Sequence, residues 1–201
     1  MRRRPRKAAR AGKVARRTRE TDVRATLRLG PGPARADTGI PFLDHMLEQL
    51  SRHGAMALSV KAKGDLAVDA HHTVEDVGIA LGEALRQATA DKVGLARYGH
   101  ALVPLDEALV EAAVDLSGRP HLTWNARLPS GKRFIGAFDV DLAQDFFQAL
   151  VNHARITLHV NVRQGRNLHH VVESIFKACA RALRAATAAE GGGLPSTKGV
   201  L

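Results

Sequence analysis

The sequence has very little cysteine and few aromatic residues. Of its 201 residues, Cys179 is the one cysteine, and aromatic residues make up 4%. An internal disulfide is therefore excluded, as are zinc or redox sites built from pairs of cysteines. Any metal ion would have to be held by histidine and carboxylate side chains. The scarcity of aromatic residues also argues against a surface on which nucleic-acid bases stack.

Long apolar runs are lacking too. No segment approaches the roughly 18 consecutive apolar residues of a membrane-spanning helix. No apolar stretch follows the basic residues at the amino terminus, as it would in a secretory signal. These absences predict a cytoplasmic protein. The composition, 45% hydrophobic and 25% charged, is that of a globular chain with one domain or two small halves.

Acidic residues are missing from the first 19 positions. This segment holds ten of the 30 basic residues, so the rest of the chain has equal numbers of each sign although the whole carries a formal net charge of +10. A segment so basic and so poor in apolar residues is expected to be disordered. We therefore predict a basic tail over residues 1–19, which would be a solvated segment, an arm that binds polyanions or an organellar presequence.

An internal repeat is the most informative feature of the sequence. Residues 71–89 and 169–187 share ten identities in 19 aligned positions, and both segments open with His-His-x-x-Glu. Residues 45–60 also align with residues 145–160 at a constant offset of 100. The chain is therefore predicted to contain two copies of one unit. We place them at residues 20–98 and 99–190, followed by a terminal loop over 191–201.

Each unit has the same order of predicted elements. In the first, alternating apolar residues predict a strand over 23–29, followed by a helix over 42–52, a strand over 57–62 and a longer helix from residue 71. The second unit repeats this order with strands over 109–116, 121–128 and 156–162 and helices over 142–153 and from residue 169. Gly30–Pro33 is expected to form a turn between strands. The predicted class is α+β, with two duplicated halves that each combine a sheet with two helices in a βαβ-type repeat.

The repeated histidine motif predicts metal sites. Successive helical residues are rotated by about 100°, so the first histidine and the glutamate four residues later share a helix face, whereas the second histidine points elsewhere. Each helix could therefore give its His–Glu pair to one ion and its second histidine to another. The aligned helix starts add one ligand apiece, a histidine and an aspartate. We predict one site of His45, His72, His169 and Glu173, and another of His71, Glu75, Asp145 and His170.

These ligands combine imidazole with carboxylate and contain no thiolate. Such a set suits Mn(II), Zn(II) or Fe(II), and an open octahedral shell without redox chemistry favours Mn(II). The isolated histidines are expected to be ordinary surface or hydrogen-bonded core residues: His53, His100, His121, His153 and His159.

Four motifs, in order, resemble the imidazoleglycerol-phosphate dehydratases of histidine biosynthesis: residues 38–47, 71–76, 165–173 and 195–201. The resemblance extends from about residue 16 to the end, and the duplication makes it more specific than any single motif. It implies the fold of the second domain of ribosomal protein S5. It also implies a lyase that dehydrates D-erythro-imidazole glycerol phosphate to imidazole acetol phosphate, with two Mn(II) ions per active site that bind the imidazolate form of the substrate. The active sites would lie between the subunits of a 24-subunit homo-oligomer.

The resemblance further implies roles for individual residues. Glu20, within the segment 16–21, is expected to contact the substrate and transfer a proton. Glu75 and Glu173 are ligands that could also move a proton. The expected substrate-binding residues are Gln49, His53, Arg97, Arg119, Ser196, Thr197 and Lys198, of which the arginines and the terminal loop would hold the phosphate. For His53, which has a repeat partner in His153, a structural role stays open.

One position departs from the family's pattern. Many members carry histidine where this chain has Asp145, so the second metal site would be more anionic, bind metal differently or use another ligand.

Two other functions remain open. One is a dinuclear metal hydrolase of a small phosphorylated substrate, against which the mainly imidazole ligand set counts. The other is an assembly stapled by structural metals, with a tail that binds nucleic acid. The neutral charge of the main body and the few aromatic residues count against it.

Overall fold

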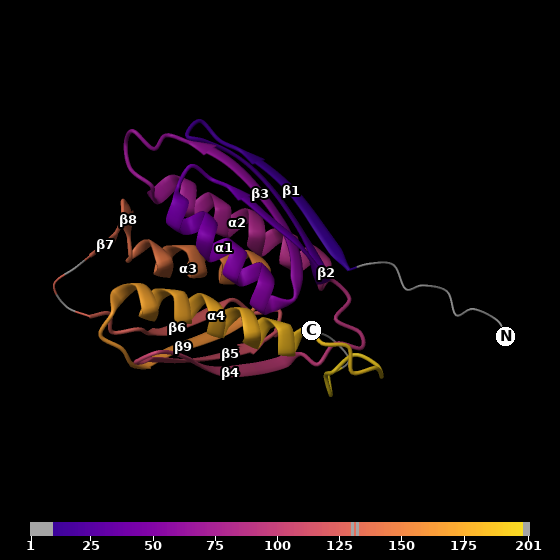
Figure 1. Ribbon diagram of the computed structural model, residues 1–201. Helices are drawn as coiled ribbons and strands as arrows, with labels where there is room; N and C mark the ends of the chain where they lie inside the picture. Colours follow the sequence, from indigo (N-terminus) through magenta and orange to yellow (C-terminus); the bar gives the residue numbers. More distant parts are fainter. Residues whose placement is uncertain (1–9, 130, 132, 199–201) are drawn as a thin grey trace.

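The structure, a computed structural model, describes residues 10–129, 131 and 133–198. Its helices and strands follow one another in the order shown in Figure 1. They are β1 (Ala11–Arg17), β2 (Thr21–Asp37), α1 (Pro41–Gly54), β3 (Met56–Gly64), α2 (His71–Ala88), β4 (Tyr98–Leu105), β5 (Ala108–Asp115), β6 (His121–Asn125), β7 (Phe134–Ile135), β8 (Phe138–Asp139), α3 (Leu142–Ala154), β9 (Thr157–Gln164) and α4 (Leu168–Ala186).

Two sheets enclose the helices. One sheet has the order β1-β2-β3 and the other β4-β5-β9-β6, and all four helices lie between them (Figure 1). Alternate residues of the strands face the helices, as in β2, where Val23, Ala25 and Leu27 are buried. This architecture confirms the predicted α+β class with two sheet-plus-two-helix halves. No helix in the described ranges combines the length and apolar character needed to cross a membrane.

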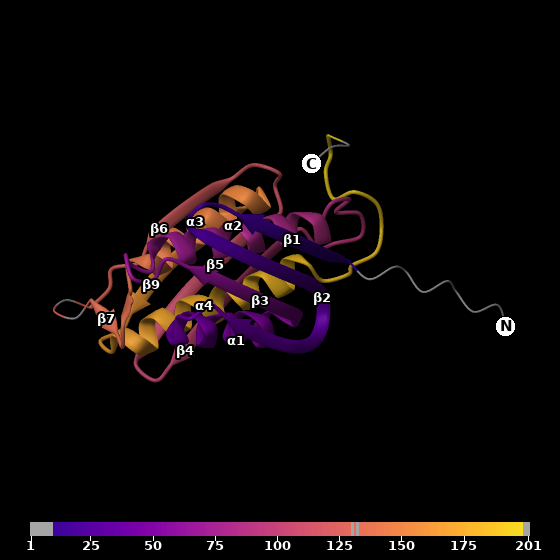
Figure 2. The same cartoon turned by 90° about the horizontal axis from the view of Figure 1, so that it is seen from above.

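The predicted turn at residues 30–33 reverses the chain within β2. Leu29 and Gly30 both lie opposite Met56, and Gly30 has a positive φ of 101°. After the turn, the residue numbers of paired positions increase on both strands, from Ala34 opposite Leu58 to Asp37 opposite Lys61. The end of β2 therefore runs in the same direction as β3, as β6 does beside β9. Figure 2 shows this bend of β2 at one end of the sheet.

Strand register shows that the two halves correspond throughout. Ala25 pairs with Val60, and Ala112 pairs with Val160. Residues 60 and 160 are themselves repeat partners, so residue 25 is equivalent to residue 112, 87 positions later. Strands β1 and β2 therefore correspond to β4 and β5. The duplication thus includes strands whose sequences show no obvious repeat.

The halves are joined through their helices. Helix α1 contacts α4, and α2 contacts α3. Two glycines let α2 and α3 come very close, because a Cβ atom on Gly78 would lie 2.7 Å from the carbonyl oxygen of Phe146, and one on Gly82 would lie 2.5 Å from that of Leu150. The two units therefore share one continuous core.

The predicted disorder of residues 1–19 is wrong for the part that the structure describes. Residues 1–9 lie outside the described residues, but β1 pairs antiparallel with β2 along its whole length, and Val14 is buried. The arginines of this segment find partners, since Arg10 pairs with Asp91 and Arg16 with Asp76. Gly12 and Val14 are buried and alternate with exposed Ala11, Lys13 and Ala15, so one face of β1 packs while the other faces water. The first half begins with β1, before residue 20.

Candidate functional site

Three of the predicted metal ligands come together at one end of the helices. His45 lies on α1, and His169 and Glu173 lie one turn apart on α4. Their ligand atoms all lie within 4.8 Å of one another. The Oε2 atom of Glu173 is 3.0 Å from Nε2 of His169 and 3.8 Å from Nε2 of His45. These three residues form the first cluster.

The start of α4 is fixed by its cap. The side chain of Asn167 accepts hydrogen bonds from the backbone N–H groups of His169 and His170, at 3.0 and 3.4 Å. A side-chain cap of this kind satisfies N–H groups that have no partner within the helix. It therefore fixes the helix turn that carries the histidine doublet.

Lys177 belongs to the first cluster although we did not predict it. Its Nζ atom lies 2.6 Å from Oε1 of Glu173, and its side chain is mostly buried. Burial alone would raise the pKa of Glu173, but the hydrogen bonds from Lys177 and His169 bring that pKa below its usual value. The available signal was the spacing of four residues between Glu173 and a lysine on a helix with few other charges.

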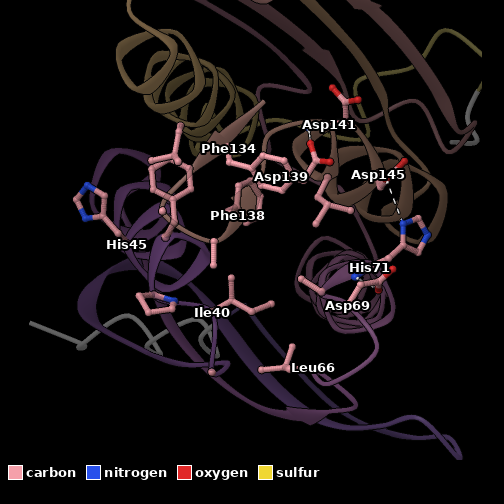
Figure 3. A pocket seen from close by; sticks show the side chains of 18 residues that line it. Ile40, His45, Leu66, Asp69, His71, Phe134, Phe138, Asp139, Asp141 and Asp145 are labelled. Atoms are coloured by element: carbon pink, nitrogen blue, oxygen red, sulfur yellow. Dashed lines mark hydrogen bonds and ion pairs between the residues drawn. The ribbon is translucent and has the colours of Figure 1, made fainter. Parts of the chain in front are cut away.

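A second cluster occupies the equivalent place in the other half. Nδ1 of His71 on α2 lies 3.5 Å from Oδ2 of Asp145 on α3, and Glu75 lies exposed one turn further along α2. A cavity of about 930 Å³ lies between the two clusters, with His45 on one side and the His71–Asp145 pair on the other (Figure 3). Apolar side chains of the β7–β8 hairpin, among them Phe134 and Phe138, line it.

The second histidine of each doublet is held away from these clusters. Nδ1 of His72 donates a hydrogen bond to Asp65 at 3.0 Å, and Nδ1 of His170 donates one to Glu107 at 2.9 Å. Each ring stands nearly perpendicular to that of its neighbour in the doublet, at 86° and 89°. One chain therefore does not bring either predicted set of four ligands together, and the inclusion of His72 and His170 in those sets stays a prediction.

Asp65 and Glu107, which we did not predict, are the hydrogen-bond partners of these histidines. The hydrogen bond to Asp65 raises the pKa of His72. The hydrogen bonds from His170 and from the backbone of Asn167 lower the pKa of Glu107 to about 2. Carboxylates that accept from one ring nitrogen orient the ring and leave the other nitrogen for a ligand. In both doublets that other nitrogen is Nε2.

Glu20 lies at the mouth of this region. It occupies the turn between β1 and β2, and its Oε2 atom is 3.8 Å from Nδ1 of His72. By strand register Glu20 is the equivalent of Glu107 in the second half, a spacing of 87 residues. Both acidic turns therefore lie beside a second histidine, but only Glu107 is hydrogen-bonded to it, since Nδ1 of His72 donates to Asp65 instead.

Gln49 and His53 follow His45 along α1. Nε2 of His53 lies 3.2 Å from Oε1 of Gln49. Burial, together with the charges of Lys177 and Arg181, lowers the pKa of His53. His53 and Gln49 thus extend the first cluster along α1, and their contact with the substrate stays a prediction.

The predicted phosphate-binding residues lie at the other end of α4. The backbone N–H of Arg97 donates to the carbonyl of Ala186, the last residue of α4, whereas His169 lies at its start. Seventeen helical steps between residues 169 and 186 span about 26 Å. One chain therefore does not bring Arg97 into contact with the first cluster.

Cations gather at this second end. The Arg97 guanidinium donates to Asp115 and to the carbonyl of Pro195, which ties the terminal loop to it. Burial, with the charges of Arg97, Arg155 and Arg119, lowers the pKa of Lys92. The predicted loop residues follow Pro195, and the backbone N–H of Lys198 donates to Ser196. Thr197 lies between these two, and residues 199–201 of the predicted loop lie outside the described residues.

Together the fold and the site define a class of enzyme: a duplicated α+β protein with histidine–carboxylate clusters at one end and a basic cluster at the other. The family model for imidazoleglycerol-phosphate dehydratase matches residues 38–183. The imidazoleglycerol-phosphate dehydratase of Anaeromyxobacter sp. (strain K) is 79% identical over 96% of this chain and 93% of its own, and that of Nitrosomonas europaea is 57% identical over 96% and 98%. The crystal structure of the enzyme from Staphylococcus aureus superposes with a TM-score of 0.81 at 38% identity, over 89% of this chain and 99% of that one. The chain belongs to the imidazoleglycerol-phosphate dehydratase family.

Proposed function

We propose that this chain dehydrates D-erythro-imidazole glycerol phosphate to imidazole acetol phosphate, a step of L-histidine biosynthesis. The observation that carries the proposal is the convergence of His45, His169 and Glu173 on one point, repeated in the other half by His71 and Asp145. Membership of the family supplies the substrate. The basic cluster around Arg97 supplies the charge that a phosphate group needs.

The donor atoms fit divalent metal ions. Imidazole nitrogens and carboxylate oxygens are ligands that Mn(II) accepts, and a spread of at most 4.8 Å is compatible with one shared ion. The first cluster would hold one ion, and His71, Glu75 and Asp145 would hold the other, giving two Mn(II) per active site. When bound, the ions would supply positive charge that stabilises the substrate's ring as an anion, and an anionic ring favours loss of hydroxide from the carbon attached to it.

The remaining ligands would come from other copies of the chain. His72 and His170 keep Nε2 available but face away from the clusters of their own chain. The basic cluster lies about 26 Å from His169, the length of α4. Complete sites between subunits satisfy both observations. We adopt the 24-subunit particle implied by the family resemblance.

The protein's own side chains handle the proton and the phosphate. Glu20 lies beside His72 and would remove the proton from the second carbon of the substrate's side chain, counted from the ring. Hydroxide would leave from the first carbon, which is attached to the ring, and take up a proton to form water. The enol that results becomes the ketone product. Arg97, Arg119 and Lys198 of another copy would fix the phosphate, while Gln49 and His53 would contact the substrate beside the first cluster.

Turnover of imidazole glycerol phosphate by protein reconstituted with Mn(II) tests the proposal. We expect imidazole acetol phosphate to form, and to disappear both on chelation and in the His71→Ala/His169→Ala double variant. A matched control is the His121→Ala/His159→Ala double variant. These histidines lie on β6 and β9 and belong to neither cluster. It should retain the activity. Absence of product from folded, metal-loaded protein would refute the proposed reaction.

A further inference from the structure

A buried carboxylate joins the turn that carries Glu20 to helix α2. Asp76 is 5% exposed and takes no part in either cluster. Its Oδ1 atom accepts from Nε of Arg16 at 2.7 Å, and its Oδ2 atom accepts from the hydroxyl of Thr21. Arg16 is the last residue but one of β1 and Thr21 is the first of β2, so Asp76 binds both sides of the turn.

The turn itself is tightly bonded within. The hydroxyl of Thr18 accepts from the backbone N–H groups of Glu20 and Thr21, at 3.1 and 3.0 Å, and lies 3.2 Å from the Thr21 hydroxyl. The backbone N–H of Thr18 donates to the carbonyl of Thr21 at 2.9 Å. Thr18 and the backbone of Glu20 are thus connected through Thr21 to Asp76.

Asp76 also lies four residues after His72 on α2, and such residues share a helix face. The carboxylate that anchors the turn and the histidine that Glu20 approaches are therefore fixed to the same rigid surface. The 3.8 Å separation of Glu20 and His72 is set by this connection.

The second half lacks this arrangement and provides an internal comparison. At the equivalent positions it has Val103, Ala108 and Ser174 in place of Arg16, Thr21 and Asp76, and the Ser174 hydroxyl has no partner among the described residues. There Glu107 is bonded directly by His170 and by the backbone of Asn167. The half whose acidic residue is fully engaged does without the network, and the half whose acidic residue stays available has it.

We propose that Asp76 is a positioning residue, which acts through Arg16 and Thr21 to keep the carboxylate of Glu20 beside His72 at the correct distance for proton transfer. This inference rests on the proposed function. Misplacement of a reacting group by about 1 Å can reduce the rate on the order of 100-fold, so the network should matter for turnover more than for substrate binding.

Steady-state kinetics of Mn(II)-loaded variants test the inference. Thr21→Val keeps the shape but removes the hydroxyl, and we expect kcat to fall about 10- to 100-fold with little change in KM. Thr21→Ser should restore kcat, and Asp76→Asn should resemble Thr21→Val. Ser174→Ala, at the position equivalent to Asp76, is the matched control and should leave kcat unchanged. Thermal unfolding and Mn(II) titration of each variant report folding and metal affinity separately.

A double-mutant cycle with Glu20→Gln identifies the path of the effect. If Asp76 acts through Glu20, Thr21→Val costs nothing more once Glu20 is replaced, because interacting sites are not additive. Full additivity, or a kcat loss that follows Mn(II) affinity or stability, would overturn the inference while leaving the reaction intact. Normal turnover by Glu20→Gln would remove both the role of Glu20 and this inference, and no turnover by the wild-type protein would refute the proposed function itself.

Discussion

At the scale of single residues, helix spacing predicted one contact of the first cluster. The pairing of His169 with Glu173 follows from a separation of four residues, which any α-helix brings to one face, and the distance of 3.0 Å confirms it. Asp65 and Glu107 were not predictable in this way. Each reaches its histidine from a loop that follows or joins strands, so its place depends on the assembled fold.

Removing Glu107 should weaken metal binding without removing any ligand. In Glu107→Gln the acceptor of the His170 Nδ1–H loses its charge, so the hydrogen bond weakens and the ring is less firmly oriented. We expect Mn(II) affinity, measured by calorimetric titration of the assembled protein, to fall about 10- to 100-fold. Glu111→Gln, which affects an ion pair with Arg163 on the sheet, is the control and should bind Mn(II) normally. Equal affinity in both variants would contradict an orienting role for Glu107.

Cys179 should be inert in the folded protein. It lies in α4 with no exposed surface, and burial raises the pKa of its thiol far above the usual value. Since the thiolate is the reactive form, a disulfide reagent such as DTNB should label no thiol in the native protein at pH 8 and one after denaturation in guanidinium chloride. Rapid labelling of native protein would show that α4 opens readily.

At the scale of helices and strands, apolar periodicity predicted the elements with a regular buried face. It missed the edge strands β1 and β4, which are held by hydrogen bonds to a neighbouring strand. All four helices were predicted, because their apolar stripes pack between two sheets. Strand β1 was not, since its high positive charge outweighed a short alternating pattern, and it is stabilised by its bonds to β2. Strand β4 also lies at a sheet edge and has exposed Tyr98 and Leu102, which blur its alternation.

The contact between α2 and α3 should not tolerate a methyl group at Gly82. Alanine normally stabilises a helix relative to glycine by up to about 1 kcal/mol. Here its Cβ would meet Leu150 and His153, so we expect Gly82→Ala to lower the free energy of unfolding by about 1 to 3 kcal/mol. Denaturant unfolding measures this. Gly193→Ala, with open space around it, is the control, and a Gly82→Ala variant as stable as the wild type would contradict the close approach.

At the scale of the whole molecule, the histidine clusters and the basic cluster lie at opposite ends of α4. The residues of both clusters could be predicted from the sequence, but their positions relative to each other could not. Separation along the chain does not determine which end of α4 a given loop contacts. The predicted sites between subunits follow naturally from this separation.

Two inactive variants should therefore restore activity to each other. His169→Ala lacks a proposed metal ligand and Arg97→Ala a proposed phosphate ligand, so each alone should lose turnover. Co-expressed, they can form sites that take the histidine cluster from one chain and the arginine from another. We expect a fraction of wild-type turnover in purified mixed assemblies, compared with the same variants assembled separately. Mixed assemblies no more active than their components would place each complete site within one chain.

The way the two halves meet also bears on how such a chain could arise. The helices of one half pack against those of the other, α1 against α4 and α2 against α3. In the described structure these helix faces are buried by this contact between the halves. A polypeptide of one half would have to find a second molecule of itself to bury them. The fold thus records a gene duplication and fusion that converted a symmetric pair of molecules into one chain, after which each half was free to evolve its own acidic turn.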